Sequence, residues 1–132
     1  MNIDKRKYNR FLAQDDAFAA LGFSAVGKVK DISMGGLAFG YIDLSDNSDQ
    51  VSSRRDAFES LPVTIFLSKN GFHLSDVPCK IIYDIITPVS DKHQMFFTSL
   101  KHRLCGVKFG MLSEDITAKL ELFLKNHTTG QT

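Results

Sequence analysis

The chain has 132 residues, of which 43% are hydrophobic and 23% are charged, and its formal net charge is +1. This length suits one domain, and this composition is that of a globular protein rather than a disordered one. A net charge near zero argues against a general affinity for nucleic acid, and no apolar run approaches the roughly 20 residues that span a bilayer.

The N-terminal residues are polar and basic. Four basic side chains fall within the first ten residues, namely Lys5, Arg6, Lys7 and Arg10. Because these charges repel one another, we expect residues 1–12 to form a flexible arm. No apolar segment follows them, as it would in a signal peptide, so we expect a cytoplasmic protein without direct membrane insertion.

The middle of the chain alternates apolar and polar side chains with a period of two, which is typical of β-strands. Strands are predicted at Ala17–Leu21, Phe23–Ile32, Gly36–Ile42, Val63–Ser68, Val77–Asp84, Gln94–Leu100 and Leu104–Phe109. The polar segment Asp43–Ser60 is predicted to be a long loop. Strands at such short intervals, with no helix between them, favour an antiparallel barrel or sandwich.

One helix is predicted near the C-terminus, over residues 113–126. Ser113 suits the N-cap position, and Glu114 and Asp115 follow in the first turn, where the helix dipole favours negative charge. The apolar side chains that share one face of this helix are Ile116, Leu120, Phe123 and Leu124. We expect this face to pack on the barrel, so that one domain covers residues 13–127 and residues 128–132 form a frayed tail.

Three short motifs stand out from this background. An RxxxR motif spans Arg6–Arg10, inside the basic arm. A DxSxxG motif spans Asp31–Gly36, where one predicted strand ends and the next begins. A Gly-x-x-Phe motif, Gly106–Phe109, ends the last predicted strand just before the helix.

Together these motifs resemble those of the PilZ domain family, which binds cyclic-di-GMP. The resemblance covers most of the chain and implies an all-β fold, a six-stranded antiparallel β-barrel with a C-terminal α-helix packed on it. It also implies a non-catalytic bacterial second-messenger receptor whose arm becomes ordered on ligand binding and signals to a protein effector, with outputs such as motility, pilus function, exopolysaccharide production or virulence. The ligand-binding residues that it implies are Arg6, Arg10, Asp31, Ser33 and Gly36.

The chemistry of these residue types fits that ligand, which carries two phosphates and two guanines. An arginine guanidinium matches guanine O6 and N7, or clamps a phosphate through two hydrogen bonds. The carboxylate of Asp31 is the complementary acceptor for the N–H donors of guanine, and Ser33 adds a hydroxyl group. Gly36 lets the backbone approach the ligand without an intervening side chain.

Four further residues are secondary candidates for the ligand site: Lys5, Gly35, Tyr83 and Arg103. Tyr83 resembles the aromatic residue that stacks on guanine in some family members, and Lys5 directly precedes the RxxxR motif. Each candidate has an ordinary alternative, since Tyr83 suits a barrel wall and Arg103 by default is a solvated side chain. The motifs have alternatives as well, as a solvated pair of arginines and an ordinary turn.

Other classes of function find less support. The four histidines have no metal-ligand spacing, Cys79 and Cys105 form no CxxC pair, and neither a nucleophile elbow nor a phosphate loop is present, so we expect no catalysis, metal or cofactor. Two rivals remain. One is a PilZ-like adaptor that binds a protein partner and no nucleotide. The other is a barrel that binds single-stranded nucleic acid, which eleven Phe residues suit but the net charge of +1 disfavours.

Overall fold

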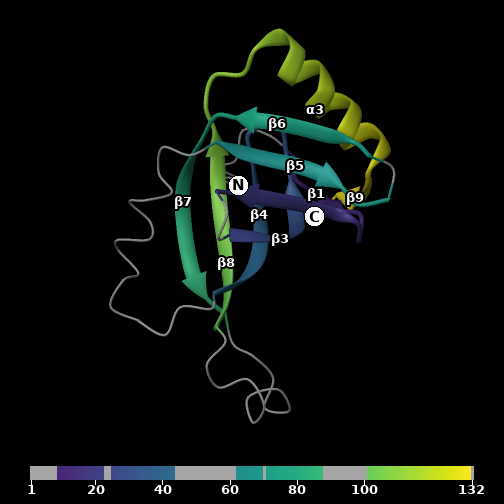
Figure 1. Ribbon diagram of the computed structural model, residues 1–132. Helices are drawn as coiled ribbons and strands as arrows, with labels where there is room; N and C mark the ends of the chain where they lie inside the picture. The colour runs from purple at the N-terminus through teal and green to yellow at the C-terminus, as the bar shows by residue number, and fades with distance from the viewer. Residues whose placement is uncertain (1–8, 23–24, 44–61, 70, 88–100, 132) are drawn as a thin grey trace, which may run out of the picture.

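The structure of the chain is a computed structural model that describes residues 9–22, 25–43, 62–69, 71–87 and 101–131. In these residues one curled antiparallel sheet carries a helix across one end (Figure 1). The elements are β1 (Phe11–Ala13), β2 (Ala17–Leu21), β3 (Ala25–Ile32), β4 (Gly36–Asp43), β5 (Val63–Leu67), β6 (His73–Val77), β7 (Cys79–Ile86), β8 (Lys101–Phe109), α3 (Glu114–Asn126) and β9 (Thr128–Gln131). Among the described residues, no helix is long and apolar enough to cross a membrane.

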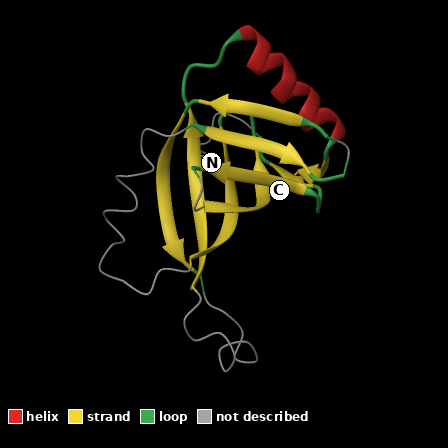
Figure 2. Cartoon of the chain, in the orientation of Figure 1, coloured by secondary structure: helices red, strands yellow, loops and turns green. Residues whose placement is uncertain are grey.

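The strands lie in the order β6-β5-β2-β3-β4-β8-β7, and β1 pairs with both β3 and β9. Figure 2 shows how the sheet curls around its concave side. Period-two alternation drives this arrangement, because β2 and β5 each bury every second residue. The buried residues form one continuous core, to which nearly every strand contributes.

The helix forms and packs as its sequence predicts. The hydroxyl of Ser113 accepts a hydrogen bond from the backbone N–H of Ile116 at 3.2 Å, which caps the first turn. Leu120 and Phe123 are fully buried, and Leu124 packs against the same core. The apolar face of α3 therefore covers one end of the curled sheet.

The described residues form nine strands rather than six, so the predicted strand count is wrong. β6 was not anticipated, and Pro78 separates it from β7, where one continuous strand was expected. The predicted frayed tail is also wrong for residues 128–131, which form β9 and pair with β1. The predicted flexible arm is wrong for Phe11 and Leu12, which lie in β1 and pair with β3 and β9. Residues 1–8, most of the predicted loop and the predicted strand Gln94–Leu100 lie outside the described residues.

One strand is shared by the two halves of the sheet. The first part of β3, Ala25–Lys28, pairs with β2, whereas its last residues, Asp31 and Ile32, pair with β1. A register shift between Val29 and Asp31 in the β3–β4 ladder marks the change. The DxSxxG motif therefore begins just beyond an irregularity, at the corner of the sheet.

Candidate functional site

The DxSxxG motif forms the tight connection between β3 and β4. The backbone N–H of Ser33 donates to the carbonyl oxygen of Gly36 at 2.8 Å. The Ser33 hydroxyl accepts a hydrogen bond from the N–H of Gly35 at 3.0 Å and donates to the Gly36 carbonyl at 3.4 Å. Ser33 is 4% exposed. In the structure this side chain thus stabilises the turn, as serine commonly does.

Gly36 lies where β4 and β8 approach each other closely. A Cβ atom at this position would lie 2.2 Å from the carbonyl oxygen of Val107, a backbone atom that the sheet holds in place. The next strand also fixes Gly35, whose carbonyl oxygen accepts a hydrogen bond from the N–H of Phe109 at 2.8 Å. The absence of a side chain at Gly36 is therefore explained by strand packing, and contact of Gly36 with a ligand stays a prediction.

Arg10 and Asp31 lie together at the rim of the sheet. The Nη1 atom of Arg10 lies 2.6 Å from Oδ1 of Asp31, and the two side chains are 26% and 19% exposed. The pairing of β1 with β3 brings them together, because Leu12 stands opposite Asp31. One arginine of the RxxxR motif thus contacts the acidic residue of the DxSxxG motif. Arg6 and Lys5 lie outside the described residues.

Tyr83 shares a face of the sheet with this ion pair. Tyr83 stands opposite Gly106, Gly106 opposite Ala38, and Ala38 opposite Asp31. Opposed residues in antiparallel strands project from the same face, so Tyr83 and Asp31 lie on one surface. Burial raises the pKa of the Tyr83 phenol, the negative charge of Asp31 raises it further, and the positive charge of Arg10 lowers it.

Arg103 occupies a different position from the one its sequence suggested. It lies three residues from Gly106 on β8 and so projects from the opposite, inner face. It is 2% exposed, with Nε 2.8 Å from Oδ2 of Asp43 and Nη1 3.3 Å from Oδ1 of Asp84. Tyr41 donates to the other oxygen of Asp84 at 2.7 Å. The expectation of a solvated Arg103 is therefore wrong. The buried network was not predicted, because the spacing of these residues in the sequence does not indicate that they meet.

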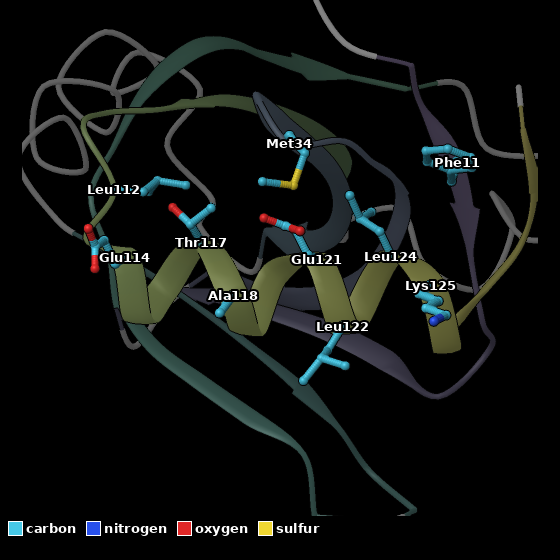
Figure 3. Close-up of a pocket in the computed structure, with 10 residues that line it drawn as sticks. All are labelled: Phe11, Met34, Leu112, Glu114, Thr117, Ala118, Glu121, Leu122, Leu124 and Lys125. Atoms are coloured by element: carbon cyan, nitrogen blue, oxygen red, sulfur yellow. The ribbon is translucent and has the colours of Figure 1, made fainter.

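A groove of about 930 Å³ lies beside the two motifs, between α3 and the rim of the sheet. Phe11, which follows Arg10, and Met34, from the β3–β4 turn, both line it. Figure 3 shows Met34, Glu121 and Leu124 directed into the same space, with Phe11 across from them on β1. The DxSxxG motif and the residue that follows the RxxxR motif therefore each contribute a side chain to a surface that they share with the helix.

The described residues offer neither a metal-binding cluster nor an activated thiol. In the described part of the chain, no group of three or more His, Cys, Asp or Glu side chains could hold a metal ion. Burial raises the pKa of Cys79 to about 11 and that of Cys105 to about 12. Both thiols are therefore protonated at neutral pH and poorly suited to nucleophilic attack.

Comparison with known proteins places the fold. No protein-family model matches the sequence, and no curated protein matches it. The solved complex of K. pneumonia MrkH with c-di-GMP matches with a TM-score of 0.61 and 17% identity, over 94% of this chain and 52% of that one. MrkH described as a c-di-GMP-dependent transcription regulatory factor matches with a TM-score of 0.58 and 16% identity, over 92% and 50% of the two chains. MrkH in its apo state matches with a TM-score of 0.57 and 15% identity, over 89% and 47%.

The chain thus spans about half the length of the solved structures that it matches, and at these identities the likeness concerns the fold. The mostly β fold with a C-terminal helix agrees with the family resemblance, whereas the number of strands differs from the six expected. The chain has the fold of a PilZ-like domain.

Proposed function

We propose that this chain is a non-catalytic receptor for cyclic-di-GMP that binds its ligand at the Arg10–Asp31 corner of the sheet. The observation that carries the proposal is the direct contact of these two side chains, 2.6 Å apart, which unites the RxxxR and DxSxxG motifs on a PilZ-like fold. The MrkH structure that matches over 94% of this chain is a complex with c-di-GMP, which supports the same ligand here.

The two partners offer complementary chemistry to such a ligand. A guanidinium binds a carboxylate, a phosphate or a guanine edge through paired hydrogen bonds, so Arg10 is chemically suited to bind the ligand while Asp31 orients it. Asp31 is 19% exposed, so its carboxylate is accessible to the N–H groups of guanine. The half-buried ring of Tyr83, on the same face of the sheet, provides a surface for stacking a base.

We assign Arg6 and Lys5 to the same site as part of the arm that precedes Arg10. Fixing the backbone of each arm residue costs about 1–2 kcal/mol, which the charged contacts with the ligand must exceed. Because the cost is recovered only with the ligand present, ordering of the arm would depend on the ligand. The arm, the ligand and the rim would then form a surface that a protein effector recognises.

The groove beside α3 is the part of the described chain best placed to take up this change. Phe11 adjoins Arg10 in the chain, and Met34 lies within the turn that follows Asp31. Movement of either motif on ligand binding would therefore alter the wall of the groove. Control of motility, pilus function, exopolysaccharide production or virulence in the cytoplasm of a bacterium is the output that the family resemblance suggests.

Calorimetric titration of the purified chain with cyclic-di-GMP tests the proposal. We expect saturable binding, weakened by about tenfold or more in Arg10→Ala and in Asp31→Ala, because hydrogen bonds to charged groups contribute about 1.5–3 kcal/mol. Lys119→Ala is the matched control, since Lys119 is 51% exposed on α3 and pairs only loosely with Asp115, at 3.7 Å.

Two outcomes would contradict the proposal. One is the absence of heat at micromolar protein, and the other is an unchanged affinity in both variants. Either would leave the Arg10–Asp31 contact as a structural ion pair and favour an adaptor that binds a protein partner without nucleotide. A salt-dependent interaction with an oligonucleotide, with no response to the cyclic dinucleotide, would favour the nucleic-acid-binding barrel.

A further inference from the structure

Gly106 has no side chain because the ring of Tyr83 occupies the space. A Cβ atom built on Gly106 would lie 2.3 Å from Cε2 of Tyr83, 2.4 Å from Cζ and 2.9 Å from Cδ2. The φ angle of Gly106 lies outside the left-handed region, so its backbone is open to any residue. Glycine at this position is therefore explained by the ring of Tyr83 and not by the backbone.

The residues that lie between Tyr83 and the ion pair, across the strands, have small side chains or none. Gly106 and Ala38 stand between Tyr83 and Asp31, and both are buried. Neighbouring strands lie about 4.8 Å apart, so three spacings separate Tyr83 from Asp31, or about 15 Å. Because the Tyr83 ring lies over Gly106, the only side chain between the ring and the Asp31 carboxylate in this row is the methyl group of Ala38. The row thus has an aromatic ring at one end and a charged pair at the other.

The backbone at Tyr83 is held by contacts of the next residue on the inner face of the sheet. A register shift between Ile81 and Tyr83 interrupts the β7–β8 ladder, and such an irregularity redirects the side chain that follows it. The next residue, Asp84, projects inward, where Arg103 lies 3.3 Å and the Tyr41 hydroxyl 2.7 Å from its oxygens. Anchoring of Asp84 on the inner face leaves Tyr83 to project outward over β8.

We propose that Gly106 is a positioning residue for ligand recognition: by lacking a side chain it lets the Tyr83 ring lie across β8 toward the Arg10–Asp31 pair, where the ring receives a guanine base. This inference rests on the proposed function for the identity of the ligand. The inference goes beyond the proposed function because it names the residue that sets the position of the Tyr83 ring. The charges of Asp31 and Arg10 both act on the Tyr83 phenol, which is consistent with a ring directed toward them.

The position of the ring can be tested without any ligand. The chain has three tyrosines and no tryptophan, so NMR of ring-labelled tyrosine, assigned with Tyr83→Phe, follows each phenol through a pH titration. In Gly106→Ala the new methyl group should push the ring into solvent and lower the pKa of Tyr83 toward its ordinary value. Gly130→Ala is the matched control, because a Cβ atom at Gly130 meets nothing within 4 Å. An unchanged Tyr83 titration in Gly106→Ala overturns the proposal.

A double-mutant cycle with cyclic-di-GMP tests the link to recognition. Gly106→Ala should weaken binding by about tenfold, the size of a lost base–aromatic stack, and Tyr83→Ala should do the same. In the Tyr83→Ala background the clash is gone, so adding Gly106→Ala should change the affinity no further. An equal loss from Gly106→Ala in both backgrounds would show that Gly106 acts on its own and overturn the positioning role.

The two tests keep this inference separate from the proposed function. If the unmodified chain does not bind cyclic-di-GMP, the proposed function fails, and the phenol titration still decides whether Gly106 sets the position of the ring. If the chain binds and Gly106→Ala binds equally well, the receptor role stands and the positioning role fails.

Discussion

Arg10 and Asp31 are 21 positions apart in the chain, and their side chains meet at 2.6 Å because Leu12 on β1 pairs with Asp31 on β3. A short strand thus holds one arginine of the RxxxR motif in place before any ligand arrives. Under the proposed function, this preformed contact lowers the conformational entropy that Arg10 loses when the ligand binds.

The geometry of Arg10 should matter as much as its charge. Arg10→Lys keeps the positive charge and loses the planar group that binds a carboxylate and a phosphate at once. We expect the affinity for cyclic-di-GMP to fall by about 10- to 100-fold, the range for one lost charged hydrogen bond. Calorimetry on Arg10→Lys beside Lys119→Ala measures this. Equal affinity in Arg10→Lys and the unmodified chain would mean that Arg10 acts as a point charge.

The buried network around Arg103 should contribute strongly to stability. Arg103→Leu leaves Asp43 and Asp84 buried without their cation, each of these side chains being 4% exposed. Loss of one partner of a buried ion pair costs about 3–5 kcal/mol of unfolding free energy. Urea denaturation measures it, and Lys119→Ala, which removes an exposed pair, should change stability by less than about 1 kcal/mol. A similar small effect in Arg103→Leu would refute the structural role of the network.

Gly36→Ala should destabilise the fold, whatever its effect on the ligand. The added methyl group would lie 2.2 Å from the carbonyl oxygen of Val107, and a backbone atom in a ladder cannot move aside as a side chain can. Overpacking of this kind costs about 1–3 kcal/mol. Thermal denaturation of Gly36→Ala against Gly130→Ala checks this. Weak ligand binding by Gly36→Ala is thus evidence for a ligand contact only if the variant remains folded.

The two thiols predict a decline in stability at high pH. In the unfolded chain a cysteine titrates near its ordinary value of 9.0, whereas burial raises the pKa of Cys79 to about 11 and that of Cys105 to about 12. The folded state therefore favours the protonated thiols. The protonated thiols therefore contribute to the free energy of unfolding in full below pH 9.0. This contribution is lost as the pH rises through the folded-state pKa values of about 11 for Cys79 and about 12 for Cys105.

Replacement of both cysteines by alanine should flatten this part of the stability curve. At neutral pH, iodoacetamide should label the thiols slowly in the native chain and quickly in denaturant, as mass spectrometry would show. Rapid labelling of the native chain would contradict the buried, protonated state.

Removal of residues 128–132 should weaken ligand binding. β1 is three residues long and lies between β3 and β9, so without β9 it becomes an edge strand with one partner. Arg10 would then be held less firmly beside Asp31. We expect a lower melting temperature and a lower affinity in the truncated chain. A truncated chain with unchanged affinity would show that β3 alone suffices to hold β1.

Periodicity predicted the strands whose two faces differ. The strand Ala17–Leu21 is confirmed to the residue. β4 and β5 begin at Gly36 and Val63, the residues at which the predicted strands begin. β1 and β9 were missed because strands of three and four residues show no alternation, and they are defined by their pairing with each other and by the pairing of β1 with β3. β6 was missed for a related reason, since Ser75 and Asp76 interrupt any apolar pattern within it.

The candidate site shows a similar limit. The residue types at Arg10 and Asp31 indicate a shared ligand through the family resemblance, and the structure brings those two side chains together. The position of Arg103 was not predictable, because its partner Asp43 lies 60 residues away and a lone arginine is usually exposed. The role of Gly106 was equally hidden, since a glycine in a strand does not reveal which neighbour occupies its space.

The change of partner along β3 also has a practical meaning for protein engineering. The strand pairs that carry Arg10, Asp31 and Tyr83 all belong to the side of the sheet formed by β1, β3, β4, β7 and β8, whereas β5 and β6 join through β2. The solvent-facing residues of the β5–β6 hairpin are accordingly the place to install a fluorophore or an affinity handle. A biosensor made from this chain could carry its reporter there, away from the proposed binding surface.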